Sequence, residues 1–277
     1  MSQQNHIGGE RPLPLKARAL ARRMPTGAHA GLWHEKFFDE YDKNWNCKLE
    51  HAGNWLKCTW GKSTPVGDRA QLEAHQKRMD ALSAHIPGSN HRNFKTTWHF
   101  ATGLGNPHPS ENGFVWHPTL GVPYLPSSGV KGLLKGWLLW QEGFKKDKHD
   151  RWLGTPNKAG ALIFFDALPV SPVKIGTDVM TPHMGDWYEK GASADPNNPK
   201  DWQNIPADWH NPKPITFLVV KKGVFRFMIA PTPRAQGADV QEALEQLAGA
   251  LEFLGAGAKT AAGYGRMTRN VAARELP

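Results

Sequence analysis

The sequence predicts an α+β domain with a ferredoxin-like order of elements, preceded by a helical extension. Short apolar runs that alternate with polar residues in steps of two indicate strands. Two longer stretches repeat their apolar residues at steps of three and four, which indicates amphipathic helices. These elements follow one another as strand, helix, strand, two hairpin strands, helix and strand. In such an arrangement the helices cover one face of the sheet and leave the other face open.

Length and composition indicate either one large domain or one domain with a substantial extension. The chain has 277 residues, of which 34 are Lys or Arg and 25 are Asp or Glu, so its formal charge is +9. We expect the domain at residues 91–277, with a long irregular insertion at 169–214, and a helical, aromatic-rich extension at residues 1–90. The positive surplus attracts phosphate backbones, so we expect an acidic partner.

The composition also argues against several classes of protein. Cys47 and Cys58 are too few for a disulfide framework and too far apart for a zinc pattern, which favours a reducing, cytoplasmic location. The 13 histidines are scattered without the spacing of metal ligands, so we expect no metal and no cofactor. There is no apolar run of about eighteen residues and no signal-peptide core, so we expect neither a membrane partner nor secretion.

The extension reads as a series of helices. Residues 15–23 predict a short basic helix, which is either a solvated face or an arm that faces phosphates or another subunit. Residues 29–60 are rich in aromatic side chains, which we expect mainly in the core or in subunit contacts. A further helix should start at Asp68, with Gln71 completing its cap, and end before Pro87.

The first half of the domain combines a strand with a capped helix. We expect the strand at residues 95–102, with His99 on one face of the sheet. In the helix that follows, Ser128 is the predicted N-cap, and Lys131 would lie in the first turn, where the helix dipole disfavours a cation by ~0.3–1 kcal/mol. A phosphate on the free N–H groups would offset this cost, with Lys135 one turn further along. The alternative is an ordinary capped helix with two solvated lysines.

Two acidic residues follow in the predicted strand and insertion. Asp166 stands near the end of a strand at residues 160–168, and a single carboxylate there is more typical of a turn cap than of a catalytic group. Within the insertion, Asp178 and His183 could form an acid–base pair, although the sequence leaves their geometry open.

The C-terminal part predicts a hairpin and a well-marked helix. Residues 215–220 and 224–230 should pair around Gly223, and residues 266–271 should form the closing strand. The helix between them should begin at Asp239, with Glu242 completing a capping box. Gly255 stands where a left-handed cap would end it.

A glycine-rich loop follows this helix. Residues 254–266 contain four glycines and four alanines, so their backbone can approach a partner closely. Lys259, Arg266 and Tyr264 suit a polyanion that also offers flat rings, as RNA does. A nucleotide P-loop needs glycine directly before its lysine, where Ala258 stands, and the dinucleotide pattern G-x-G-x-x-G fails as well. The alternative is a long glycine-rich helix terminator.

Three segments carry a resemblance to a known family. They are G-A-G-A-K-T-A-A-G-Y-G-R at 255–266, P-Y-L-P-S-S-G-V-K-G at 123–132, and L-G-x-x-x-x-x-G-x-L-x-F-x-D, which ends at Asp166. Together they resemble the RAMP superfamily of CRISPR proteins. D-x-x-T-P-H at 178–183 resembles a segment of one RAMP subunit of type III-B (Cmr) effector complexes. The likeness covers roughly residues 94 to 272, most of a domain of ordinary size.

The resemblance implies a ferredoxin-like, RRM-like RAMP fold and a non-catalytic subunit in antiviral defence that binds guide RNA (crRNA). Such a subunit would cap the guide-RNA 3′ end of the backbone filament. Its partners would be guide RNA, target RNA, and the backbone filament, head and small subunits of the ribonucleoprotein. The insertion, with Asp178 and His183, would be a thumb-like loop that touches RNA or a neighbouring subunit. We expect RNA contacts at Ser127, Ser128, Gly129, Lys131, Lys135, Gly255, Gly257, Lys259, Thr260, Gly263, Tyr264 and Arg266.

Two other functions stay open from the sequence. One is a metal-independent endoribonuclease of the same superfamily that processes guide RNA, in which His99 or His183 would act with Lys259 on a ribose 2′-OH. The other is an assembly scaffold whose aromatic side chains contact protein.

Overall fold

The computed structural model describes residues 24–42, 44–47, 49–61, 63–141, 146–195, 197–206 and 212–270. The basic helix predicted at residues 15–23 and the end of the closing strand at residue 271 lie outside these ranges. Within them the chain is a mixture of helices and antiparallel sheet, so the α+β class is confirmed. No helix of the described residues is long and apolar enough to cross a membrane.

The larger sheet of the described chain has the strand order β10-β2-β9-β5. β2 (Asn90–Thr96) pairs with both β9 (Val224–Pro231) and β10 (Met267–Arg269), and β5 (Leu162–Phe164) pairs with the far end of β9. The two-residue β6 (Leu168–Pro169) pairs with the start of β9. All of these pairs are antiparallel. Read across the sheet from β10 to β5, the neighbouring strands are the fourth, first, third and second of these four along the chain.

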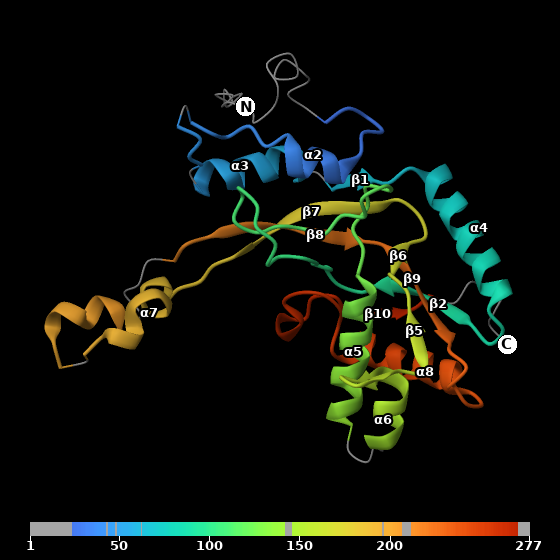
Figure 1. Ribbon diagram of the computed structural model, residues 1–277. Helices are drawn as coiled ribbons and strands as arrows, with labels where there is room; N and C mark the ends of the chain where they lie inside the picture. Colours follow the sequence, from blue (N-terminus) through green and yellow to red (C-terminus); the bar gives the residue numbers. More distant parts are fainter. Residues whose placement is uncertain are drawn as a thin grey trace.

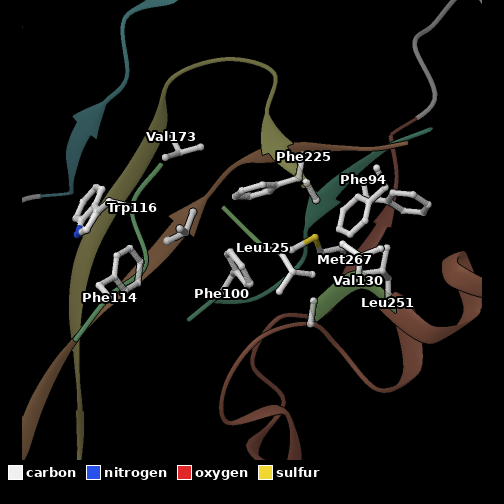
Figure 2. Packing of buried hydrophobic residues seen from close by; sticks show 14 of the residues in the cluster. Phe94, Phe100, Phe114, Trp116, Leu125, Val130, Val173, Phe225, Leu251 and Met267 are labelled. Carbon is white, nitrogen blue, oxygen red and sulfur yellow. The ribbon is translucent and has the colours of Figure 1, made fainter. Parts of the chain in front are cut away.

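Two helices bury one face of this sheet. α5 (Ser127–Trp140) and α8 (Asp239–Phe253) pack against each other, and each directs an apolar stripe into the core. From the sheet, alternate residues of β9 point toward them, and Figure 2 shows how the side chains interlock. Each fully buried side chain of this size contributes about 1.5–3 kcal/mol to folding. Core residues from the sheet and the two helices include Phe94, Phe225, Phe227, Val130, Leu134, Leu244 and Leu251.

A second sheet corrects the hairpin that the sequence predicts. β8 (Ile215–Lys222) pairs with β7 (Val173–Met180), and β7 pairs with β1 (Thr64–Val66). Thus β8 and β9 follow each other in the chain but lie in different sheets, with Gly223 at the crossing. The reason lies in the burial of β8: five consecutive residues are buried because α3 covers this sheet, whereas a hairpin in one exposed sheet would show alternation.

The predicted irregular insertion is therefore partly regular. β7 lies inside it, and β7 and β8 extend together as a long arm that carries α7 (Gly185–Lys190) at its end (Figure 1). Two 3₁₀ turns, η1 (Gly191–Ser193) and η2 (Pro199–Asn204), complete the tip. The proline and glycine content of this segment predicted irregular structure, but the segment contains an eight-residue strand.

The extension contributes helices and a strand. α2 (Ala30–Lys36) and α3 (Leu49–Trp60) bury many of their aromatic side chains, as expected, and α3 packs on β7 and β8. α4 (Arg69–His85) starts as predicted, because the Asp68 carboxylate accepts a hydrogen bond of 2.8 Å from the Gln71 N–H. β1 was not expected, and it joins the extension to the second sheet.

Two further predictions about the sheet need correction. The first core strand spans Asn90–Thr96 rather than 95–102, because the chain bends after Thr96 and Phe100 then pairs with Val220 of the second sheet. The face expected to be open is partly occupied by α4. Arg226 of β9 bonds to Asp80 of α4 at 2.6 Å, and a cavity of about 150 Å³ remains between the helix and the sheet.

The short elements between β2 and β5 lie beside the two core helices. α6 (Lys146–Leu153) contacts α5, and β3 (Gly154–Thr155) pairs with β4 (Lys158–Ala159). Arg151 and the Trp152 indole N–H both donate to the Asp239 carboxylate at the start of α8. These bonds anchor α6 to α8. Asp239 is the first residue of α8 and Ala238 is its N-cap, so Asp239 is not the capping residue that the sequence predicts.

Candidate nucleic-acid interface

A groove of about 540 Å³ lies between α5 and the glycine-rich loop. In Figure 1 the loop, in red, lies beside α5. Backbone and small side chains form most of the walls. The lining residues are Leu125, Gly129, Gly132, Leu133 and Gly136 on one side, and Phe253, Leu254, Gly255, Gly257, Thr260, Ala261 and Arg266 on the other. The two segments that the sequence singled out therefore face each other across an open space.

The α5 wall is a row of glycines. Gly129, Gly132 and Gly136 are three and four residues apart and so share one helical face. A Cβ added at Gly132 or Gly136 would meet no atom within 4 Å, so the core does not require glycine there. Each glycine in a helix interior costs about 0.8–1.0 kcal/mol relative to alanine. This periodicity is visible in the sequence, but Gly132 and Gly136 were not among the predicted site residues.

The opposite wall depends on glycines in left-handed conformations. Gly255 has φ +80° and ends α8 as predicted. At Gly257, φ is +85° and an added Cβ would lie 2.1 Å from the Ala101 carbonyl oxygen. At Gly265 it would lie 1.8 Å from the Ala256 carbonyl oxygen. The loop therefore folds tightly against its own chain, and larger residues at these positions would displace it.

Many N–H groups of the loop are already bonded within the protein. The Ala256 N–H donates to Gly265 O at 2.9 Å, and the Gly265 N–H donates to His99 O at 2.7 Å. Ala258, Ala262, Gly263 and Tyr264 also donate to backbone carbonyls. In the described part of the chain, the N–H groups of Gly257 and Thr260 have no backbone acceptor outside regular elements, and both residues line the groove. The anion cradle expected over residues 255–265 is thus smaller than predicted.

The start of α5 differs from the prediction in a way that matters for charge. Pro126 rather than Ser128 is the N-cap, and the Ser127 N–H donates to the Asp166 carboxylate at 2.7 Å. A negative group at this helix end was expected, and Asp166 supplies it. The carboxylate complements the helix dipole, so the N-terminus does not need a phosphate for that purpose.

The predicted basic residues do not lie together at the groove. Arg266 is exposed and lines the groove, and it has no carboxylate partner among the described residues. Lys131 and Lys135 are exposed on α5 but do not line the groove. Lys259 turns toward the second sheet, where its ammonium group lies 2.7 Å from Met180 Sδ and 5.4 Å from the centre of the Phe217 ring.

Tyr264 belongs to a small polar cluster behind the loop. Its hydroxyl donates to Asp178 at 2.6 Å, and His99 Nδ1 lies 3.0 Å from the same carboxylate oxygen. Burial and the neighbouring Asp178 raise the pKa of Tyr264. Burial would raise the pKa of Asp178, but hydrogen bonds from Tyr264, the Val179 N–H and His99 outweigh it and lower that pKa. The cluster clamps the glycine-rich loop to β7.

This clamp changes three assignments. Tyr264 is held by Asp178 and by a ring contact with Phe217, so it is not presented as a free stacking surface. Asp178 pairs with His99 rather than with His183, which is exposed in the loop after β7. His99 is oriented by a carboxylate through one ring nitrogen, which is the arrangement of a general base.

Trp98 was also absent from the predicted site residues. Its side chain is 55% exposed, and its ring stacks on His99 with centroids 4.8 Å apart. An exposed tryptophan in an alternating strand pattern can indicate a binding residue. The exposure of Trp98, however, depends on the bend of the chain after Thr96. The described residues contain no group of three or more metal-binding side chains.

Comparison with known proteins gives concordant results. The model of the RAMP superfamily matches residues 93–268. The chain is similar to the CRISPR system Cmr subunit Cmr6 of Pyrococcus furiosus, with 28% identity over 290 aligned positions that cover 79% of this chain and 81% of that protein. It is also similar to the Cmr6 subunit of Saccharolobus solfataricus, at 25% identity over 56% of this chain and 47% of that protein.

A solved structure shares the fold. A chain in the cryo-EM structure of the type III-B Cmr-beta bound to cognate target RNA superimposes with a TM-score of 0.58 and 17% identity. The match covers 80% of this chain and 71% of that chain.

Proposed function

Because the chain belongs to the RAMP superfamily and is similar to Cmr6 over most of its length, we propose that it is an RNA-binding subunit of a type III-B CRISPR effector complex. Its role is to bind, not to cut. The RNA is the guide RNA, whose 3′ end the subunit caps at the end of the backbone filament. Target RNA and the filament, head and small subunits are its other partners.

The groove between α5 and the glycine-rich loop carries this proposal. Its volume of about 540 Å³ lies within the usual range of ligand sites, about 300–1,000 Å³. Its glycine walls let a sugar–phosphate strand approach the backbone closely. Arg266 and the N–H groups of Gly257 and Thr260 offer positive charge and hydrogen-bond donors to phosphates. The formal charge of +9 supplies long-range attraction.

A salt titration of guide-RNA binding tests the site. Replacing Arg266 by alanine should weaken binding for every RNA sequence and should flatten the plot of log K against log salt by about 0.7, the value for one phosphate contact in a single strand. Arg78→Ala is the matched control, because Arg78 is an exposed arginine on α4, which does not line the groove. If both variants change the slope equally, the arginine acts through general charge and the groove is not the site.

A second function is favoured by one observation, the His99–Asp178 pair. A histidine oriented by a carboxylate could take the proton from a ribose 2′-OH and so cleave RNA without a metal. Incubating the protein with precursor guide RNA and a chelator separates the two functions. If the wild type gives discrete products and His99→Ala gives none, the protein is an endoribonuclease and not a binding subunit.

A further inference from the structure

An exposed group of aromatic rings stands at the end of the groove. Trp140 ends α5 and Phe253 ends α8, and their side chains are 57% and 54% exposed. The two rings stack with centroids 4.8 Å apart and an interplanar angle of 26°. Trp137 lies against both rings, with its centroid 5.4 Å from that of Trp140 and 6.1 Å from that of Phe253. Such exposed rings contribute little to the core, so their presence calls for another role.

The group is held in a defined position. The Trp137 indole N–H donates to Gln246 of α8 at 2.8 Å. Its ring also lies on Gly249, where an added Cβ would come within 2.8 Å of the indole. Trp137 is thereby fixed between α5 and α8, and it supports the two outer rings. A rigid pair of exposed rings loses little conformational entropy when a flat ligand stacks on it.

The rings are continuous with the proposed phosphate site. Phe253 lines the groove together with Gly257, Thr260 and Arg266. A single surface therefore offers donors for phosphate and flat apolar faces. Nucleotides in a single strand present this same combination, and proteins that bind single strands pair basic grooves with aromatic stacking residues.

We propose that Trp140 and Phe253 form a stacking platform for a nucleobase of the single-stranded RNA whose backbone lies in the groove. The inference rests on the proposed function and adds a second contact to it. The platform binds through ring faces that every base possesses, so it holds the strand without reading its sequence.

Equilibrium binding of a fluorescein-labelled uridine homopolymer to the purified full chain tests the platform. Trp140→Ala combined with Phe253→Ala should weaken binding about 5- to 150-fold, the range for loss of one stacked base. Trp140→Phe should retain most of the affinity because a ring remains. The salt slope should not change, since neither ring contacts a phosphate. An abasic ribose–phosphate strand of the same length should bind wild type and double variant equally.

The matched control is Leu139→Ala, because Leu139 is 67% exposed in the same helical turn but is not part of the ring stack. It should bind RNA like the wild type. Unchanged affinity in the double variant, or an equal loss on the abasic strand or in Leu139→Ala, would overturn the platform. Unchanged RNA affinity with impaired binding to a purified filament subunit would assign the rings to a protein interface. The Arg266→Ala slope is measured separately, so failure of the platform is distinguishable from failure of the groove.

Discussion

Replacing Gly132 and Gly136 by alanine tests whether these glycines serve the stability of the fold or the binding of RNA in the groove. Both glycines are interior residues of α5, and a Cβ at either position meets no atom within 4 Å. Each replacement should stabilise the helix by about 0.8–1.0 kcal/mol, so the double variant should gain about 1.5–2 kcal/mol. For a chain of this size that gain raises the melting temperature by about 3–8 °C.

The same change should impair RNA binding. Both methyl groups would enter the groove, because Gly132 and Gly136 line it. A sugar–phosphate strand that lies against the helix backbone would have to move outward and lose at least one close contact. We expect a loss of roughly 1 kcal/mol, or about fivefold in affinity, for the double alanine variant. Gly136→Leu, which fills more of the groove, should lose more.

Thermal unfolding and RNA titration of the same preparations give both quantities. Gly105→Ala is the control, because an added Cβ there also meets no atom within 4 Å and Gly105 does not line the groove. It should leave RNA affinity unchanged. A double variant that is more stable and binds RNA normally would show that the strand does not follow α5. A less stable variant would refute the account of why these glycines are present.

Three further outcomes follow from the structure. Tyr264→Phe removes the hydroxyl that donates to Asp178, so urea unfolding should show a loss of about 1.5–3 kcal/mol; an unchanged midpoint would mean that the clamp does not form. Asp239→Ala leaves Arg151 and the Trp152 N–H without their acceptor and should lower the free energy of unfolding by about 2–3 kcal/mol. This loss is smaller than that for breaking a fully buried ion pair, because Arg151 is partly exposed. The third concerns His34, whose ring nitrogens are buried without partners among the described residues, so that burial and the nearby His108 lower its pKa. The folded state therefore favours neutral His34, and stability should be complete above about pH 6.5 and fall as pH drops below it. His34→Phe should reduce this fall in a series of melting curves, and an equal pH dependence in both proteins would contradict the reasoning.

Features set by neighbouring residues could be read from the sequence. The Asp68 cap and the left-handed Gly255 are as predicted, because each depends on a hydrogen bond or backbone conformation within a few residues. The glycine-rich loop and the Pro126 to Lys131 segment were likewise found, since small residues and turn residues act locally. Apolar periodicity located α5 and α8 for the same reason.

Tertiary structure decided what these segments can offer to a ligand. Asp166 occupies the start of α5 from a distant part of the chain, and His99 and Ala101 carbonyls accept loop N–H groups that the sequence left free. Lys259 is drawn to the second sheet, so Arg266 is the predicted cation that remains at the groove.

What the sequence by itself determined was the Asp68 cap, the left-handed Gly255 and the apolar stripes of α5 and α8, because these depend on short-range sterics and hydrogen bonds. Only the tertiary structure decided that β8 and β9 belong to separate sheets, that Asp178 pairs with His99, and that Phe253 lines the same groove as the glycines of α5. Such contacts join residues far apart in the chain. Their choice depends on which surfaces become buried together, which no local pattern records.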